Sequence, residues 1–86
     1  MKVASLKDFK AGWFVGDFEP SIFKNPFFEV AHHSHTKGQE TFPHYHAVTT
    51  ELNYIVKGEL TVSGQHLKSG DMWIYESNEV SDVEFL

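Results

Sequence analysis

The stretch FPHYHAVTTE, residues 42–51, contains two histidines two residues apart and a glutamate five residues after the second one. On an extended strand such side chains project from the same face, so we expect His44 and His46 to lie roughly 6–7 Å apart at Cα. Neutral imidazoles at this spacing can bind one metal ion. The carboxylate of Glu51 would complete a two-histidine, one-carboxylate set that leaves coordination positions open. The alternative is a solvated histidine pair, with Glu51 as an ordinary surface charge.

The segments that carry these residues have the pattern of short β-strands. Six glycines and three prolines punctuate the chain. Between them lie runs rich in β-branched and aromatic residues, which are WFV, FFEVAHH, ELNYIV, ELTV, DMWIY and VEFL. This pattern predicts an all-β fold. From Glu51 onward the turns KGE, SGQ and SGD recur about every six residues, which predicts an antiparallel meander of hairpins.

The wider spacing adds a family resemblance. Glycines flank the candidate ligands, and the fixed positions are Gly38, His44, His46, Glu51 and Gly58. They resemble the first motif of the cupin family, G(X)5HXH(X)3-4E(X)6G. The segment KSGDMWIY resembles the start of the family's second motif, and the resemblance covers roughly residues 28–82. It implies a cupin-type double-stranded β-helix, or jelly-roll barrel, with a divalent metal inside, held by the two histidines and the glutamate.

The second motif departs from the family pattern G(X)5PXG(X)2H. Counted from Gly70, its proline, glycine and histidine positions hold Glu76, Asn78 and Ser81. The family's fourth ligand is therefore replaced by a serine hydroxyl, which is a poor ligand. Asp82 would substitute for it only after a one-residue slip of the strand, which would turn its side chain inward. Otherwise Asp82 is a surface residue.

Further candidates line the expected cavity. If the strand after Phe28 alternates with period two, His32 shares the inward face, whereas His33 and His35 point outward. Asn53 shares the face of Glu51, and a buried asparagine requires a partner such as a substrate or a metal-bound water. In the segment 72–75, the pair Trp73 and Tyr75 or the pair Met72 and Ile74 faces inward. The sequence leaves this choice open.

Length and composition set the remaining limits. Eighty-six residues predict one domain, in which residues 1–20 form an N-terminal strand and turn segment and residues 28–82 carry the cupin motifs. A net charge of −5 without a basic stripe disfavours nucleic acid, and no apolar run is long enough to span a membrane. The absence of cysteine and of an apolar signal segment favours the cytoplasm.

The sequence after the second motif is short for the family, which usually carries further strands that close the barrel. We therefore expect either a piece of a longer polypeptide, in which the barrel is incomplete at its C-terminal end, or a partner chain that covers an exposed edge. A homodimer that buries part of GWFVGDF, residues 12–18, is the expectation for the association state.

Two classes of function follow from the residues and the resemblance. The first is a metal-dependent isomerase or oxygenase that acts on a small acidic or carbonyl substrate. The second is a small-molecule binding or sensing module, with or without metal. The expected cofactor is one divalent ion, zinc, nickel, iron or manganese. A metal-binding single-domain cupin is the favoured interpretation, and whether it is an enzyme stays open.

Overall fold

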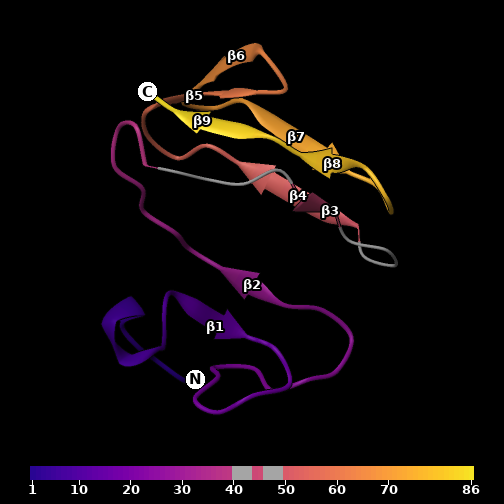
Figure 1. Cartoon of the computed structure of the whole chain (residues 1–86). Helices are drawn as coiled ribbons and strands as arrows, with labels where there is room; N and C mark the ends of the chain where they lie inside the picture. The colour runs from indigo at the N-terminus through magenta and orange to yellow at the C-terminus, as the bar shows by residue number, and fades with distance from the viewer. Residues whose placement is uncertain (40–43, 46–49) are drawn as a thin grey trace. The chain divides into compact units, whose positions relative to one another are not determined.

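A computed structural model describes residues 1–39, 44–45 and 50–86, and these residues form an all-β protein (Figure 1). One three-residue 3-10 helix, η1 (Leu6–Asp8), is the sole helical element within these ranges. The described chain divides into two compact units, Met1–Ser34 and His35–Leu86. The expected all-β class is therefore confirmed.

The first unit is built on one short ladder. Strand β1 (Trp13–Val15) pairs antiparallel with β2 (Val30–Ala31). The loop between them is fixed by Asn25, which is buried. Its Nδ2 donates to the carbonyl of Phe23 over 3.2 Å, and its Oδ1 accepts from the backbone N–H groups of Phe27 and Phe28 over 2.9 and 3.1 Å. These side-chain bonds add to backbone bonds of the same loop, in which the N–H of Asn25 donates to the carbonyl of Gly16 over 3.2 Å.

Seven strands lie in the described part of the second unit. They are β3 (His44–Tyr45), β4 (Glu51–Tyr54), β5 (Glu59–Val62), β6 (Gln65–Lys68), β7 (Met72–Tyr75), β8 (Val80–Ser81) and β9 (Val83–Phe85). Their antiparallel pairs are nested, because β5 pairs with β6, β4 with β7, and β3 with β8. Strand β9 pairs with the other edge of β5.

The meander expected from the turn spacing is therefore wrong. Of the three turns KGE, SGQ and SGD, SGQ alone joins neighbouring strands as a hairpin, since Val62 pairs with Gln65 and both Ser63 and Gly64 have positive φ. Positive φ at both central residues is the requirement of a two-residue type I′ turn. The glycine turns at 58 and 70 do not close hairpins of their own. They lie where the two sides of the nested ribbon pass from one ladder to the next.

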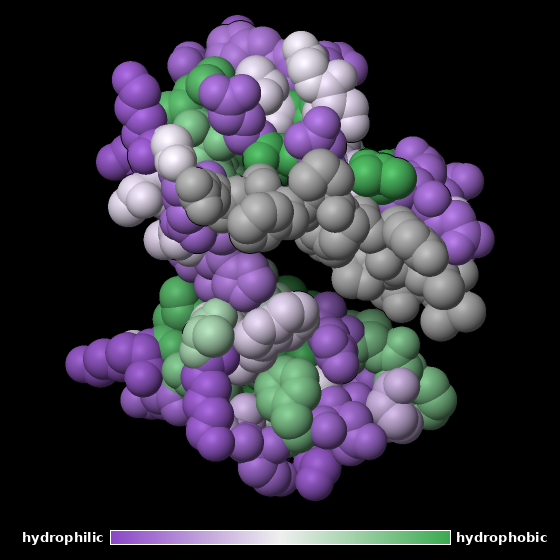
Figure 2. Space-filling view, in the orientation of Figure 1, coloured by the Kyte–Doolittle hydropathy of each residue, from purple (hydrophilic) through white to green (hydrophobic). Residues whose placement is uncertain are grey.

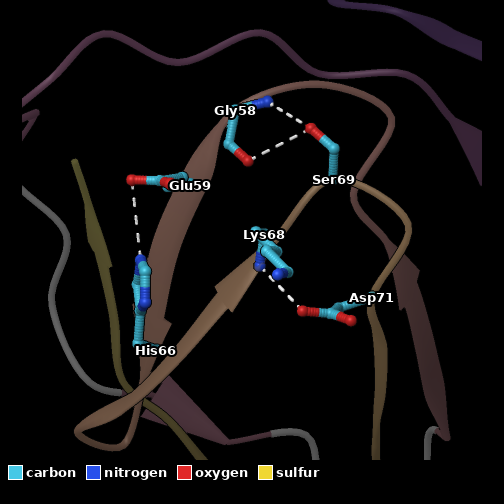
Figure 3. A network of polar contacts seen from close by, with 6 residues as sticks. All are labelled: Gly58, Glu59, His66, Lys68, Ser69 and Asp71. Atoms are coloured by element: carbon cyan, nitrogen blue, oxygen red, sulfur yellow. Dashed lines mark hydrogen bonds and ion pairs between the residues drawn. The ribbon is translucent and has the colours of Figure 1, made fainter.

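Hydrogen bonds join these two turns to each other. The N–H of Gly70 donates to the carbonyl of Ile55 over 2.8 Å, and the N–H of Ile55 donates to the carbonyl of Asp71 over 2.9 Å. The N–H of Gly58 donates to Ser69 Oγ over 2.9 Å (Figure 3). In the same view, Asp71 Oδ2 accepts from the backbone N–H of Lys68 over 2.9 Å. The ribbon therefore stays paired where it leaves regular β-structure.

A small apolar cluster fills the inner side of the second unit. Its four buried members retain 6–9% of their exposure, and they are Ile55, Leu60, Val62 and Tyr75. Partly buried side chains that pack around them are Leu67, Trp73, Val83 and Phe85. The cluster arises from alternation along β5, where Leu60 and Val62 point inward between residues that are exposed or half-buried.

The outer side of the β4–β7 ladder is apolar and exposed. Leu52 is paired with Ile74 and Tyr54 with Met72, and these four side chains keep 51–70% of their surface in solvent. On the face of the molecule drawn in Figure 2, residues coloured green for hydrophobic reach the surface among hydrophilic ones. Among the described residues, no helix has the length and apolar character needed to cross a bilayer.

We predict that Gly58→Ala destabilises the protein by about 1–2 kcal/mol, because an L-residue is strained at positive φ. Gly58 has φ +106°, and an added Cβ would meet no atom within 4 Å, so the cost comes from the backbone alone. Urea unfolding measures the change, and Lys57→Ala, at the adjacent exposed position, is the matched control. Equal stability of the two variants would show that the turn tolerates a side chain.

Candidate metal and ligand site

The β4–β7 ladder presents four side chains toward the interior of the second unit. Along β4, Glu51 and Asn53 are half-buried and alternate with exposed residues. Along β7, Trp73 is half-buried and Tyr75 is buried. Glu51 is the register partner of Tyr75, and Asn53 is that of Trp73. The choice left open by the sequence is therefore decided, since Trp73 and Tyr75 face inward and Met72 and Ile74 face outward.

The β3–β8 ladder pairs the candidate ligand His44 with Ser81, which stands where the cupin pattern has its fourth ligand. His44 is the register partner of Ser81, and Ser81 is buried with 9% exposure. Residues directly opposite in an antiparallel pair occupy the same face of the ladder. The backbone position of His44 in β3 is directly opposite that of the buried Ser81.

Asp82 lies on the other side of the chain from Ser81. Its side chain is exposed, and its backbone carbonyl accepts from the N–H of Ser63 over 2.8 Å. The slip that would have turned Asp82 inward has not occurred, because Ser81 holds the buried position. Of the two candidates at this end of the chain, Ser81 is therefore buried and Asp82 is exposed.

The remaining histidine candidates are distributed differently. His32 lies in the first unit, where its side chain is exposed and its backbone N–H donates to the carbonyl of Gly12 over 3.0 Å. His33 packs edge-on against Trp13 with ring centroids 5.4 Å apart. His35 stacks on Phe85 with centroids 4.0 Å apart.

His46 lies outside the described residues, so the complete triad of His44, His46 and Glu51 stays a prediction. Across the side chains that the structure describes, no group of three histidine, aspartate or glutamate residues is close enough to hold a metal ion. The donor set nevertheless fits a divalent cation in part. Glu51 brings a carboxylate to the inward face of β4, and imidazole and carboxylate are the ligands that first-row metals accept.

Two aromatic residues with polar atoms accompany Asn53, and the sequence analysis did not assign them to the site. Asn53 Nδ2, Trp73 Nε1 and Tyr75 OH are each buried without a hydrogen-bond partner in the structure. Tryptophan and tyrosine at alternate positions of DMWIY were the signal in the sequence. Without the register of β7, that signal was indistinguishable from core packing.

A groove in the first unit differs in character from the inward face of the β4–β7 ladder. It is a shallow groove of about 210 Å³, lined by Ala4, Ser5, Leu6, Phe9, Phe14 and Ile22. No titratable side chain lines it, so it offers apolar contact and no group for metal binding or proton transfer.

Comparison with known proteins gives no match, since no family model, no curated protein and no solved structure is similar to this chain. The properties of the site therefore follow from its own residues and register.

We predict that the two carboxylates differ in their effect on metal binding. Glu51→Gln should weaken binding by at least about tenfold, since even changes behind a ligand cost that much. Asp82→Asn should leave binding unchanged because its side chain is exposed. Titration with zinc, followed by a competing chromogenic chelator, measures both. A loss of affinity in the aspartate variant that equals the loss in the glutamate variant would contradict the assignment.

Proposed function

We propose that this protein is a small cupin-like module that binds a divalent metal through His44, His46 and Glu51 and takes up a small molecule beside it. The observation that carries the proposal is the register of β3 on β8. The cupin resemblance makes the positions of His44 and Ser81 two ligand positions of one site. The ladder independently sets these two residues opposite each other, although they are 37 positions apart in the chain.

The nested pairing supports the finer proposal of a jelly-roll barrel. A jelly roll arises when one long antiparallel hairpin is folded over, so that the innermost strands pair at the hairpin tip and the outer strands pair in succession. The order β5·β6, β4·β7 and β3·β8 has this property. The resemblance of residues 28–82 to the cupin motifs points to the same architecture.

The chain's residues favour binding over proton transfer. A bound metal would supply Lewis acidity toward a ligand oxygen. On the inward face of the β4–β7 ladder, Glu51 is the one carboxylate, and no histidine occupies the other three positions. With Glu51 engaged as a ligand, this face offers no second carboxylate or imidazole as a general base. A metal-dependent isomerase or oxygenase and a metal-free binding module are the alternatives.

Metal content tests the proposal. The parent protein and His46→Ala are purified without a nickel column, soaked in zinc, nickel, iron or manganese, and analysed by elemental mass spectrometry. We expect about one ion per parent chain and much less in the variant. Occupancy should fall on acidification because protons compete for the imidazole nitrogens. Equal metal in both proteins, or none in the parent after soaking, would favour the metal-free module.

We also predict that a ligand can be restored at the buried position of β8. Ser81→Cys is nearly isosteric, and a thiolate is a strong zinc ligand, so zinc affinity should rise by at least about tenfold. Asp82→Cys is the matched control, because its side chain is exposed and the parent sequence contains no cysteine. Cobalt substitution reports the same change through thiolate-to-metal absorption. The same gain in both variants, or in neither, would contradict the placement of Ser81 beside the metal.

We propose in addition that the protein is a homodimer. Within the GWFVGDF segment, Val15 and Gly16 are already buried and Trp13 is partly exposed, whereas the outer face of β4–β7 exposes four apolar side chains. An interface between identical chains can place one such face against its own copy across a twofold axis. The outer face of β4–β7 is therefore the better candidate for the contact.

Ile74→Glu should convert the dimer to a monomer, because it introduces a charge into the apolar contact. Light scattering at micromolar concentration measures the mass. Lys68→Glu, at an exposed position of β6, is the control and should remain dimeric. A monomeric parent protein would contradict the proposal.

A further inference from the structure

Three buried hydrogen-bond donors lie together on the inward face of the β4–β7 ladder. Asn53 and Trp73 are direct register partners, and Tyr75 is two residues beyond Trp73 on the same face. The rings of Trp73 and Tyr75 meet edge-to-face with centroids 6.3 Å apart. Asn53 Nδ2, Trp73 Nε1 and Tyr75 OH are shielded from solvent and have no partner in the structure.

Unpaired groups of this kind are unusual in a folded protein. Nearly all buried polar atoms are hydrogen-bonded, because a buried donor without an acceptor loses the hydrogen bonds it made with water. All three such atoms found among the described side chains belong to one ladder face. Clustering on one face indicates a common missing partner. A ligand that supplies an acceptor would recover part of this loss.

The donor chemistry defines that partner. An indole offers one N–H and no acceptor, and an amide Nδ2 offers two N–H groups. The tyrosine hydroxyl adds a third donor. The complement of several donors on one face is an oxygen that accepts hydrogen bonds, as carbonyl and carboxylate oxygens do.

Charge distinguishes between these two acceptors. The remaining inward position of the ladder is Glu51, directly opposite Tyr75, and none of the four positions is lysine or arginine. In the metal-free protein, a carboxylate ligand would meet the like charge of Glu51 without a cation from this face, whereas an uncharged carbonyl would not. We therefore propose that Asn53, Trp73 and Tyr75 bind the uncharged carbonyl oxygen of a small-molecule amide or ketone. This inference deepens the proposed function and rests on it for the presence of a small-molecule site.

The experiment uses the indole N–H resonances of the full-length, chelator-treated protein. The chain has two tryptophans, so the ¹H–¹⁵N spectrum contains two indole signals, and Trp73→Phe assigns them. The probes are acetamide and acetate, which have nearly the same shape and differ in charge. We expect acetamide to shift the Trp73 signal saturably, with Trp13 as an internal control for general solvent effects. Acetate should bind at least about tenfold more weakly.

Variants separate a ligand-binding role from a structural role. Tyr75→Phe removes one donor and should weaken acetamide binding roughly two- to tenfold, as expected for one neutral hydrogen bond. It should leave the melting temperature of the ligand-free protein unchanged or raise it, because it removes an unpaired polar group. Tyr54→Phe, on the exposed outer face of the same ladder, is the control and should leave acetamide binding unchanged.

Three results would overturn the inference. The first is the absence of a saturable shift with acetamide, and the second is acetate binding as tight as acetamide binding. The third is a lower melting temperature in Tyr75→Phe without an effect on acetamide, which would show that the hydroxyl has a structural partner. Since the protein is free of metal in these measurements, the outcome is independent of the metal content that tests the proposed function.

Discussion

The antiparallel pairing of β4 with β7 is the contact on which the second unit depends. It joins residues 51–54 to residues 72–75, so the chain between them must return as a paired ribbon. The hairpin at Ser63 and Gly64 supplies the reversal, and the bonds among Ile55, Gly70 and Asp71 keep both sides together through the corner. Buried backbone groups must find partners, and this nested arrangement provides them without any helix in the unit as described.

One register fixes the chemistry of both faces of that ladder. A slip by one residue would turn Leu52, Tyr54, Met72 and Ile74 inward and expose the polar set, because side chains alternate along a strand. Such a slip would bury more purely apolar surface. The observed register instead buries an amide, an indole N–H and a phenol, and half-buries a carboxylate. An interior that carries polar groups at a cost in stability, while apolar groups remain outside, is typical of a binding site.

The small core is the consequence of this choice. In the described part of the second unit, four apolar side chains are buried, and each retains some exposure. A chain of 86 residues has little apolar surface to spare, and several large apolar side chains are left in solvent. The first unit adds Val15 as a buried apolar residue and uses the satisfied amide of Asn25 to order its loop. Apolar area buried against a second chain would add to the small apolar area that one chain buries by itself.

The sequence by itself determined the class of fold and the location of the strands. Short β-branched and aromatic runs between glycines predicted an all-β protein, and the strands β4, β5 and β7 lie within those runs, because local backbone preference and period-two patterning act over a few residues. Strand β6, with the sequence QHLK, lies in none of them. The sequence also singled out Asn53 and Glu51 on one strand face. The sequence did not predict which strands pair with each other. The turns at Gly58, Gly64 and Gly70 have similar local sequences, yet only the turn at Gly64 closes a hairpin. The tertiary structure alone decided that Trp73 and Tyr75 face inward and that Ser81 rather than Asp82 is buried opposite His44, because the face a residue occupies depends on the strand across from it.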